Sequence, residues 1–420
     1  MTEVVDVAVV GAGAAGLATA IFAAHRRPSL SVVAFDGART LGAKILVSGG
    51  GRCNVTNRVV VPADFRGGSR HVVGRILSAF TAEQTAAWFR EMGVALHEEP
   101  GGKLFPDSNK ARSVLNALLA EAERHGARLL PGHRVLAVDR VGEGFVVETP
   151  HGRWAARRVV LATGGLSLPK SGSDGGGYAL AQGLGHTLVP PIPALVPLVL
   201  DGTFHVGLAG VSHEALLTVR PAGLKATTVS GPLLWTHFGA SGPAALDASR
   251  FWHRARAEGR SVTVSVNLLA GETFESLEAW LLARARASPR QRLGTALAGR
   301  LPARLGDAVP VALGIPPTIS LGRLLREDRR RLVRALVEWP LPVRDSRGYD
   351  YAEVTGGGVP LNEVDPATLE SRMCPGLHLV GEILDVDGRI GGFNFQWAWS
   401  SAWATAAGLG SSPSMRASFP

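Results

Sequence analysis

The first 36 residues alternate between apolar runs and a glycine-rich turn, in an order typical of a βαβ unit. Residues 4–10 form a valine-rich apolar run, residues 14–26 are rich in alanine, and residues 30–35 form a second apolar run that ends at Asp36. Short β-branched runs predict buried strands, and the longer alanine-rich run predicts a helix. The pattern therefore predicts strand, helix and strand, with the sequence GAGAAG at residues 11–16 between the first two.

Further helices and strands alternate through the next part of the chain. Helices are predicted over residues 81–93, where Thr81 and Gln84 form a capping box, and over residues 108–126. Short strands are expected at residues 134–139, 145–149 and 153–155, and apolar strands at 158–161 and 376–382. This mixture predicts an α/β fold.

A middle segment breaks this alternation. The proline-rich residues 190–197 read as a linker, and β-rich segments follow at 195–200, 214–219, 224–229 and 261–268. We expect this middle segment, residues 191–347, to form a domain of its own, called here the insert. The insert is predicted to contain a β-barrel over about 191–271 and helices over about 272–340.

The positive charge of the chain is concentrated in this insert. The formal net charge is +9, and residues 284–347 alone hold 14 arginines against 5 acidic residues. A local basic excess is typical of proteins that bind phosphate-rich partners. The alternative is an arginine-rich genome and a solvated helix face, because the insert has no interleaved aromatic residues and no RNA-binding signature.

Only two cysteines occur, Cys53 and Cys374, and their separation fits no disulfide framework, metal site or dithiol redox centre. A reducing cytoplasm is therefore expected. Residues 7–24 carry no charge, but they are built largely of alanine and glycine and follow the acidic Glu3 and Asp6. We expect a soluble protein with neither a membrane segment nor a metal.

The glycine-rich turn indicates dinucleotide binding. Gly11 permits a tight turn, Gly13 allows a diphosphate to approach the backbone, and Gly16 lets the helix pack on the strand. The helix start, including Ala14 and Ala15, offers free N–H groups to phosphate. Asp36 can accept a hydrogen bond from a ribose hydroxyl, which favours FAD or NAD over NADP.

The order of these elements resembles the FAD-binding domain of glutathione-reductase-like flavoproteins. The segments LGAKILVSGGGRCNVTN, GKLFPDSNKARSV, THFGASGP, TGGGV and GEILDVDGRIGGFNFQWAWSSA also resemble the BaiN-type, aminoacetone-oxidase-like flavoprotein family, with matches from residue 5 to about residue 408. The resemblance implies a discontinuous FAD domain of the Rossmann type, with residues 1–190 as its first part, residues 191–347 as an inserted domain, and residues 348–420 as its second part.

The same resemblance implies where the cofactor binds. The loop at residues 48–57 would pass close to the flavin, where glycines clear space, Lys44 and Arg52 could stabilise negative charge, and Asn54, Thr56 and Asn57 could form hydrogen bonds. The late acid, here Glu382 in place of the usual Asp, would bind the ribityl chain. The full predicted cofactor set is Gly11, Gly13, Ala14, Ala15, Gly16, Asp36, Lys44, Gly50, Gly51, Arg52, Asn54, Thr56, Val135, Thr163, Gly164, Gly381, Glu382, Gly391, Gly392 and Asn394.

The predicted activity is an FAD-dependent oxidoreductase, with NAD(P)H as a transient donor and an unsaturated C=C compound as acceptor. Cys53 and His237 are candidate proton donors, although Cys53 also fits a small buried residue. The resemblance leaves open an amine oxidase that uses O₂ and a reductase of uracil in structured ribosomal RNA. A flavin-holding RNA-binding protein without turnover is a further alternative. The partner is therefore a small molecule or a structured RNA.

Overall fold

The computed structural model describes residues 3–409 and divides the chain into two compact units. The first unit contains the residues up to Pro191 and those from Glu353, and the second contains Ile192–Ala352. The first unit is therefore discontinuous in sequence, and the second is inserted into it.

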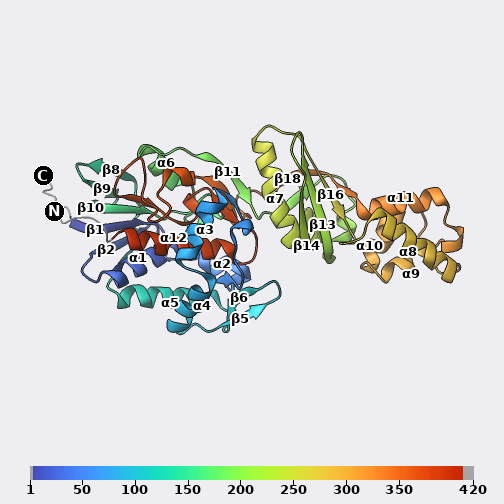
Figure 1. Cartoon of the computed structure of the whole chain (residues 1–420), viewed down its shortest axis with the longest axis horizontal. Coiled ribbons are helices and arrows are strands. Elements are labelled where there is room, and N and C mark those ends of the chain that lie inside the picture. The colour runs from blue at the N-terminus through green and yellow to red at the C-terminus, as the bar shows by residue number, and fades with distance from the viewer. Residues whose placement is uncertain (1–2, 410–420) are drawn as a thin grey trace. The chain divides into compact units, whose positions relative to one another are not determined.

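A seven-stranded sheet organises the first unit (Figure 1). Its order is β7-β2-β1-β10-β9-β8, with β20 also paired to β10. The strands are β1 (Glu3–Val10), β2 (Val32–Asp36), β7 (Arg128–Pro131), β8 (Ala137–Val141), β9 (Gly144–Thr149), β10 (Gly152–Leu161) and β20 (Leu377–Leu379). Strands β1, β2, β7, β10 and β20 are parallel, and β8 and β9 form an antiparallel meander with β10. The valine-rich runs thus become buried parallel strands, as their composition predicts.

Strand β10 corrects the sequence prediction of two separate strands at 153–155 and 158–161. It is one ten-residue strand, because Arg157 and Arg158 interrupt the apolar pattern without ending the strand. One edge of β10 pairs with β1 over almost its whole length. The other edge is shared, first by β9 and then by β20. This sharing sets the turns after β1, β10 and β20 side by side.

Helices cover this sheet, and α1 (Ala14–Arg26) packs against both α5 (Ala111–Arg124) and α12 (Phe393–Gly408). Figure 1 shows α1 and α12 adjacent, although they come from opposite ends of the chain. Helix α12 is almost wholly buried, and Trp397 and Trp399 belong to the core, as expected. The remaining helices are α2 (Ala43–Gly51), α3 (Arg70–Ala79), α4 (Ala82–Glu91) and α6 (Gly176–Gly183).

Smaller sheets complete the first unit. They pair β3 (Thr56–Asn57) with β6 (Lys103–Pro106) and β5 (Leu96–Glu99), β4 (Phe65–Gly67) with β21 (Val386–Gly388), and β11 (Val189–Ala194) with β19 (Val354–Gly358). The uncharged stretch at residues 7–24 is the end of β1, a turn and most of α1. Within residues 3–409, no helix has the length and apolar character needed to cross a membrane.

The second unit contains one seven-stranded antiparallel sheet in the order β17-β16-β13-β14-β15-β12-β18. These strands are β12 (Leu198–Leu200), β13 (Ser212–Pro221), β14 (Thr227–Thr236), β15 (Gly239–Ser241), β16 (Val262–Asn267), β17 (Trp339–Leu341) and β18 (Val343–Ser346). Strands β17 and β18 are separated only by Pro342, so the continuous segment 339–346 pairs with β16 at one end of this order and with β12 at the other. The two ends of the sheet therefore meet along one stretch of chain, as the predicted β-barrel requires.

Five helices accompany this sheet within the described residues 192–352, and the predicted helical character of residues 272–340 is confirmed. Helix α7 (Gly242–Ala257) packs on β13 and β14. The others are α8 (Phe274–Ala287), α9 (Leu293–Ala298), α10 (Ala303–Ala312) and α11 (Arg326–Val337). Buried residues from the sheet and from all five helices form one hydrophobic cluster, so the insert has its own core.

Candidate cofactor site

The turn between β1 and α1 is too crowded to accept side chains at two of its glycines. Gly11 has a φ of +100°, and a Cβ there would lie 2.5 Å from the carbonyl oxygen of Ala162. A Cβ on Gly16 would lie 1.8 Å from the carbonyl oxygen of Gly11. Gly11 therefore forms the tight turn, and Gly16 allows the close packing of the helix on the strand, as the sequence predicted.

Gly13 differs from these two glycines because its missing side chain faces open space. A Cβ on Gly13 would meet no atom within 4 Å. Gly13 is also the N-cap of α1, which has no side-chain cap and no acidic residue in its first turn. The first N–H groups of a helix lack intrahelical partners and attract anions. Ala14 and Ala15 therefore start a helix whose N-terminus is open to a phosphate.

Asp36, at the end of β2, is fixed beside this turn. Its two carboxylate oxygens accept hydrogen bonds from the backbone N–H groups of Ala12 and Ala38, both at 2.8 Å. The carboxylate is therefore oriented by backbone donors, and each oxygen keeps a further lone pair for a hydroxyl.

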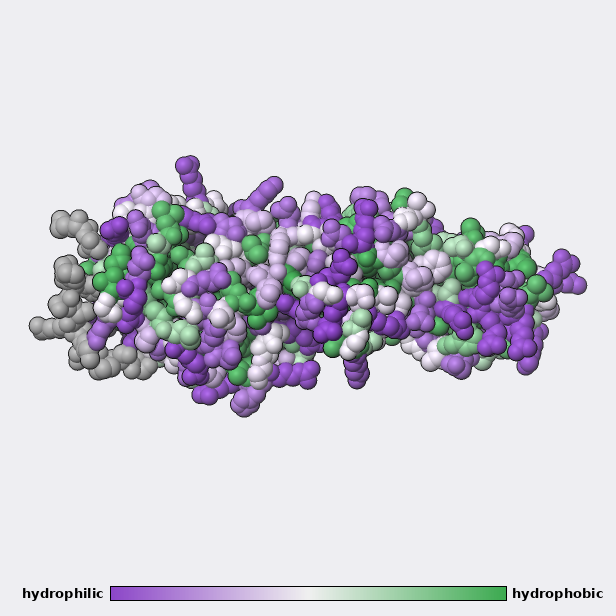
Figure 2. Space-filling view, turned by 90° about the horizontal axis from the view of Figure 1, so that it is seen from above, coloured by the Kyte–Doolittle hydropathy of each residue, from purple (hydrophilic) through white to green (hydrophobic). Residues whose placement is uncertain are grey.

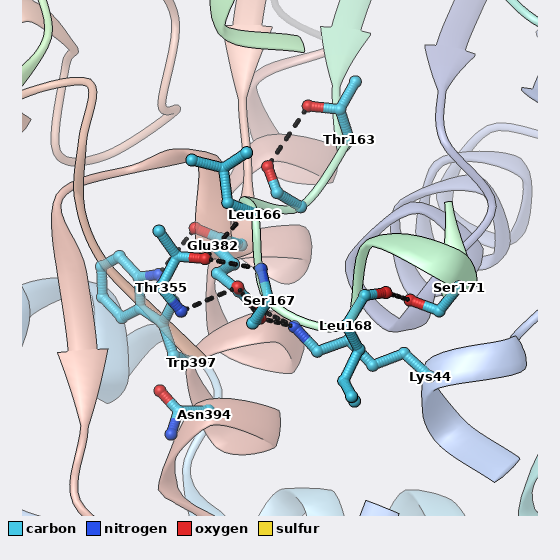
Figure 3. Close-up of polar contacts among 12 residues, drawn as sticks. Lys44, Thr163, Leu166, Ser167, Leu168, Ser171, Thr355, Glu382, Asn394 and Trp397 are labelled. Carbon is cyan, nitrogen blue, oxygen red and sulfur yellow. Dashed lines mark hydrogen bonds and ion pairs between the residues drawn. The ribbon is translucent and has the colours of Figure 1, made fainter. Parts of the chain in front are cut away.

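Glu382 is the centre of a polar cluster made from four segments that are distant in sequence (Figure 3). Its Oε2 lies 2.6 Å from Lys44 Nζ, and its Oε1 accepts hydrogen bonds from the Ser167 hydroxyl at 2.7 Å and the Thr355 N–H at 3.0 Å. Thr355 Oγ1 in turn accepts the N–H groups of Leu166 and Ser167. The cluster joins α2, the turn after β10, β19 and the turn after β20.

Gly381, the neighbour of Glu382, connects this cluster to both principal helices. Its φ is +73°, and a Cβ on it would lie 2.7 Å from the Cβ of Ala15 in α1. Its carbonyl accepts the indole N–H of Trp397, and its N–H donates to Ser401. Gly381 thus lies between the N-terminal turn of α1 and the middle of α12.

The loop at residues 48–57 follows a path that few sequences allow. Gly49, Gly50 and Gly51 have φ values of +55°, +69° and +82°, and Cys53 has a φ of +62°. α2 departs from helical geometry from Ser48 onward, which explains why the sequence pattern did not predict it. Left-handed conformations cost little for glycine but are strained for cysteine.

Cys53 points into the core at the end of this path. It has no solvent exposure, and burial raises the pKa of its thiol to about 12, against a small opposing effect from a hydrogen bond with Ser48. These surroundings match the expected small buried residue. They do not resemble those of a reactive thiol, which needs exposure and a lowered pKa.

The second half of the loop is attached to the start of α12. Asn57 donates its amide to the carbonyl of Gly391 at 3.0 Å, and a Cβ on Gly392 would lie 2.5 Å from the carbonyl of Thr56. Thr56 donates its hydroxyl to Gln396, and Trp399 donates its indole N–H to Val55. Gly391 and Gly392 are therefore required for close contact between the loop and α12.

Asn54 places an unsatisfied acceptor at this contact. Its Oδ1 is buried, has no hydrogen-bond partner among the described residues, and lies 2.9 Å from the position of a Cβ on Gly392. The N-terminus of α12 likewise has no side-chain cap and no acidic first turn. An orphaned acceptor, two open helix N-termini and a glycine cradle fit a cofactor with a diphosphate and a polar ring, as FAD has.

Three side chains that were predicted to contact the cofactor have partners within the protein. The positive charges of Lys44 and Arg52, treated as free in the sequence analysis, are paired with Glu382 and Glu99. Arg52 also lies over the ring of Phe105 at 4.1 Å. Asn394 exchanges two hydrogen bonds with the backbone of Gly388, so its amide holds the turn before α12.

The remaining predicted site residues are three in the first unit and one in the second. Thr163 and Gly164 follow β10 and face α6, where a Cβ on Gly177 would lie 1.8 Å from Thr163 Oγ1. Val135 is buried just before β8. His237 belongs to the second unit, in the turn between β14 and β15, and its ring contacts Phe238.

Ser167 and Thr355 were missed as site residues by the sequence analysis. TGGGV was quoted as a motif, but no sequence signal linked Thr355 to Glu382. A second polar group was also missed: Ser371 Oγ lies 2.8 Å from His186 Nε2, and His186 Nδ1 lies 2.7 Å from Glu363.

The Ser371–His186–Glu363 group has the contacts of a hydrolytic triad but not its exposure. His186 and Ser371 are both buried, and Ser371 Oγ accepts the N–H groups of Met373 and Cys374. Burial raises the pKa of Glu363, but hydrogen bonds from Thr187 and His186 more than offset this and hold it below its ordinary value. The group therefore ties the chain around Glu363 to α6 and offers no nucleophile to a substrate.

Comparison with known proteins covers nearly the whole chain. Residues 5–408 match the family described as the HI0933-like protein Rossmann domain. Ribosomal RNA dihydrouridine synthase of Escherichia coli is 37% identical over 409 residues, covering 96% of this chain and 98% of that protein. A 3-dehydro-bile acid delta(4,6)-reductase of Clostridium scindens is 33% identical over 397 residues, covering 94% of this chain and 97% of that protein.

Solved structures show the same fold at low sequence identity. E. coli quinol fumarate reductase FrdA aligns with a TM-score of 0.51 and 18% identity, covering 97% of this chain and 70% of that chain. The Rossmann-type fold and the family predicted from the motifs are thereby confirmed. The chain belongs to the HI0933-like, BaiN-type family of FAD-dependent Rossmann flavoproteins, a family of flavoenzyme reductases.

Proposed function

We propose that this protein is an NAD(P)H-dependent reductase that binds FAD in its first unit and reduces the C5=C6 bond of uracil in a structured RNA. The cofactor assignment is supported by the open N-termini of α1 and α12 and by Glu382, whose neighbour Gly381 contacts both helices. Bound FAD would supply the transfer of a hydride from a nicotinamide donor to an unsaturated acceptor.

The protein residues would bind and orient the reactants. The first N–H groups of α1 would hold the diphosphate, and the Asp36 carboxylate would accept a ribose hydroxyl. Glu382 would accept a ribityl hydroxyl while Lys44 and Ser167 keep it in place. The open N-terminus of α12, with its partial positive charge, would stabilise negative charge near the ring, and Asn54 Oδ1 would accept a ring N–H.

Similarity to the E. coli ribosomal RNA dihydrouridine synthase is the observation that carries the choice of acceptor. The alignment covers 96% of this chain, so it includes the arginine-rich insert as well as the flavin unit. The proposed reaction transfers a hydride to one carbon of the uracil double bond and a proton to the other, while NAD(P)H becomes NAD(P)⁺. An RNA acceptor would place the protein in the cytoplasm.

A small unsaturated ketone is the second candidate acceptor. The bile-acid reductase relative is 33% identical over 94% of the chain, so the same fold accompanies acceptors of very different size. Both candidate reactions reduce a C=C bond with the same electron source. They differ in whether the acceptor carries phosphates.

Two measurements test the proposal. Stopped-flow mixing with NADPH or NADH should bleach the flavin absorbance of the purified protein, whereas amines should not. Ribosomal RNA from a strain that lacks the gene should then gain two hydrogens at a uridine, detected by mass spectrometry, on incubation with protein and NAD(P)H. Flavin bleaching without a mass change in RNA, together with reduction of an enone, would replace the RNA acceptor with the small-molecule one.

A further inference from the structure

The insert concentrates positive charge in one part of its sequence. From residue 279 to residue 306 the chain contains six arginines and no acidic residue. Figure 2 shows strongly hydrophilic side chains gathered over the helical part of the insert, at the right of the view. Only those arginines that are not engaged in the fold are available to a binding partner.

Several arginines of the insert are engaged in the fold. Arg329 is paired with Glu278 at 3.5 Å and is mostly buried, and Arg300 is paired with Glu272. Arg331 contacts Asp328 and the carbonyl of Leu313. Replacing Arg329 and Arg331 would therefore damage the insert and would not isolate the contribution of these arginines to binding.

Several arginines of the insert are exposed and have no carboxylate within 4.0 Å among the described residues, and five of these lie in the neighbouring segments 286–292 and 323–326: Arg286, Arg290, Arg292, Arg323 and Arg326. Backbone bonds hold their segments together. Gly322 donates its N–H to Pro289, Leu321 donates to Gln291, and Arg292 forms a β-bridge with Ser320. The 3-10 turn Leu321–Arg323 also packs against α8, which carries Arg286. The five residues thus share a continuous surface, called here the arginine surface.

We propose that the arginine surface binds the phosphate backbone of a structured RNA. Arginine forms bidentate hydrogen bonds with phosphate, and five exposed arginines without a paired carboxylate raise the local potential for a polyanion. The surface contributes no base-specific contact in this proposal, so it would increase affinity and leave the choice of uridine to the flavin unit. This inference rests on the proposed RNA acceptor.

The test compares two triple variants with equal loss of charge. R290S/R292S/R323S removes the centre of the arginine surface. R27S/R90S/R112S removes three exposed arginines of the first unit that likewise have no ion pair among the described residues. Fluorescence anisotropy would follow a fluorescein-labelled RNA hairpin with uridines in its loop, over a series of KCl concentrations.

We expect the surface variant to bind the hairpin about 10–100-fold more weakly at low salt, with a salt slope reduced by about one for each phosphate that the variant no longer neutralises. The control variant should bind like the wild type. Both variants should keep FAD and its reduction by NAD(P)H. Equal binding by the surface variant and the wild type would overturn the inference, as would equal weakening in both variants or binding to anionic vesicles in preference to RNA.

The outcome for the surface is separable from the outcome for the proposed reaction. If RNA is reduced and the surface variant retains its affinity and its KM, the surface assignment fails and the reaction stands. If no uridine is reduced but hairpin binding depends on these arginines, the reaction fails and the surface stands.

Discussion

Lys44 Nζ lies 2.6 Å from Glu382 Oε2, although 338 positions separate the two residues in the sequence. Their side chains are 27% and 17% exposed, so the pair is largely shielded from solvent. Removing one partner of such a pair leaves the other charge partly desolvated and uncompensated. The pair joins the two sequence parts of the flavin unit.

A double-mutant cycle on this pair should show coupling. Glu382→Gln keeps the shape and the hydrogen bonds from Ser167 and Thr355 but removes the charge, and we expect it to lower the free energy of unfolding by about 1–3 kcal/mol. Lys44→Met should cost a similar amount, and the double variant should cost less than the sum. Urea unfolding of the FAD-free wild type, the two single variants and the double variant measures the four free energies that the cycle needs. Strictly additive losses of unfolding free energy would contradict the pairing.

Substitution of Gly13 and of Gly16 by alanine should have different effects on stability and on FAD binding. Gly16→Ala places a Cβ 1.8 Å from the carbonyl oxygen of Gly11, so we expect a loss of about 1–3 kcal/mol in unfolding free energy even without cofactor. Gly13→Ala meets no protein atom within 4 Å and should leave the FAD-free protein about as stable as the wild type.

FAD titration of both variants completes this test. Gly13→Ala should weaken FAD binding although its unfolding free energy is close to that of the wild type, because the added methyl group would lie where the phosphates approach the backbone. Wild-type FAD affinity in Gly13→Ala would move the diphosphate away from the start of α1.

Asn54→Leu should affect the free and the loaded protein in opposite directions. The buried Oδ1 has no partner among the described residues, and an unsatisfied buried acceptor costs about 1–3 kcal/mol. Its replacement by a side chain of similar size should therefore not lower, and should slightly raise, the melting temperature of FAD-free protein. FAD affinity should fall, because the acceptor for the ring N–H is gone. A parallel loss of stability and affinity would indicate a structural role only.

Cys53 gives a prediction about alkaline pH. Its pKa of about 12 in the folded protein lies above the ordinary value of 9.0, so the unfolded chain loses this proton first as pH rises. The stability contributed by the protonated thiol is complete below pH 9 and is lost between pH 9 and 12, by about 1.4 kcal/mol for each pH unit.

Cys53→Ala removes this dependence. The difference in unfolding free energy between wild type and variant should shrink by about 1.3 kcal/mol between pH 10 and pH 11. Turnover at neutral pH should be retained, since a fully buried thiol cannot contact the acceptor. A fall in product formation of roughly 10²–10⁴-fold, with flavin reduction intact, would instead identify Cys53 as the proton donor.

The sequence predicted the first βαβ unit because local composition and the glycine spacing both depend on nearby residues. It failed where the determining contact is distant. Arg157 and Arg158 suggested a break in β10, yet pairing with β1 keeps that strand continuous. The glycines after Val47 concealed α2, because they end the helix within three turns of its start.

The site was predictable in its parts but not in its connections. The position of Gly16 follows from its motif, and its predicted close packing against the backbone is confirmed. Gly392 also lies against backbone, at Thr56, whereas the role of Gly391 and Gly392 in cofactor binding stays a prediction. That Lys44 and Arg52 would be neutralised by Glu382 and Glu99 depends on tertiary contacts across the unit. The same applies to Ser167 and Thr355, whose residue types carry no distinctive spacing.

The discontinuity of the first unit has a consequence for synthesis on the ribosome. Helix α1 is made at the start of translation, but its packing partner α12 and the turn at Gly381 come only after the whole insert. At roughly 5–20 residues per second, tens of seconds separate the two. During that interval the apolar face of α1 lacks its cover, so nascent chains should need chaperone protection. Chains stopped before residue 393 should not retain flavin, which makes cofactor retention a report of complete translation.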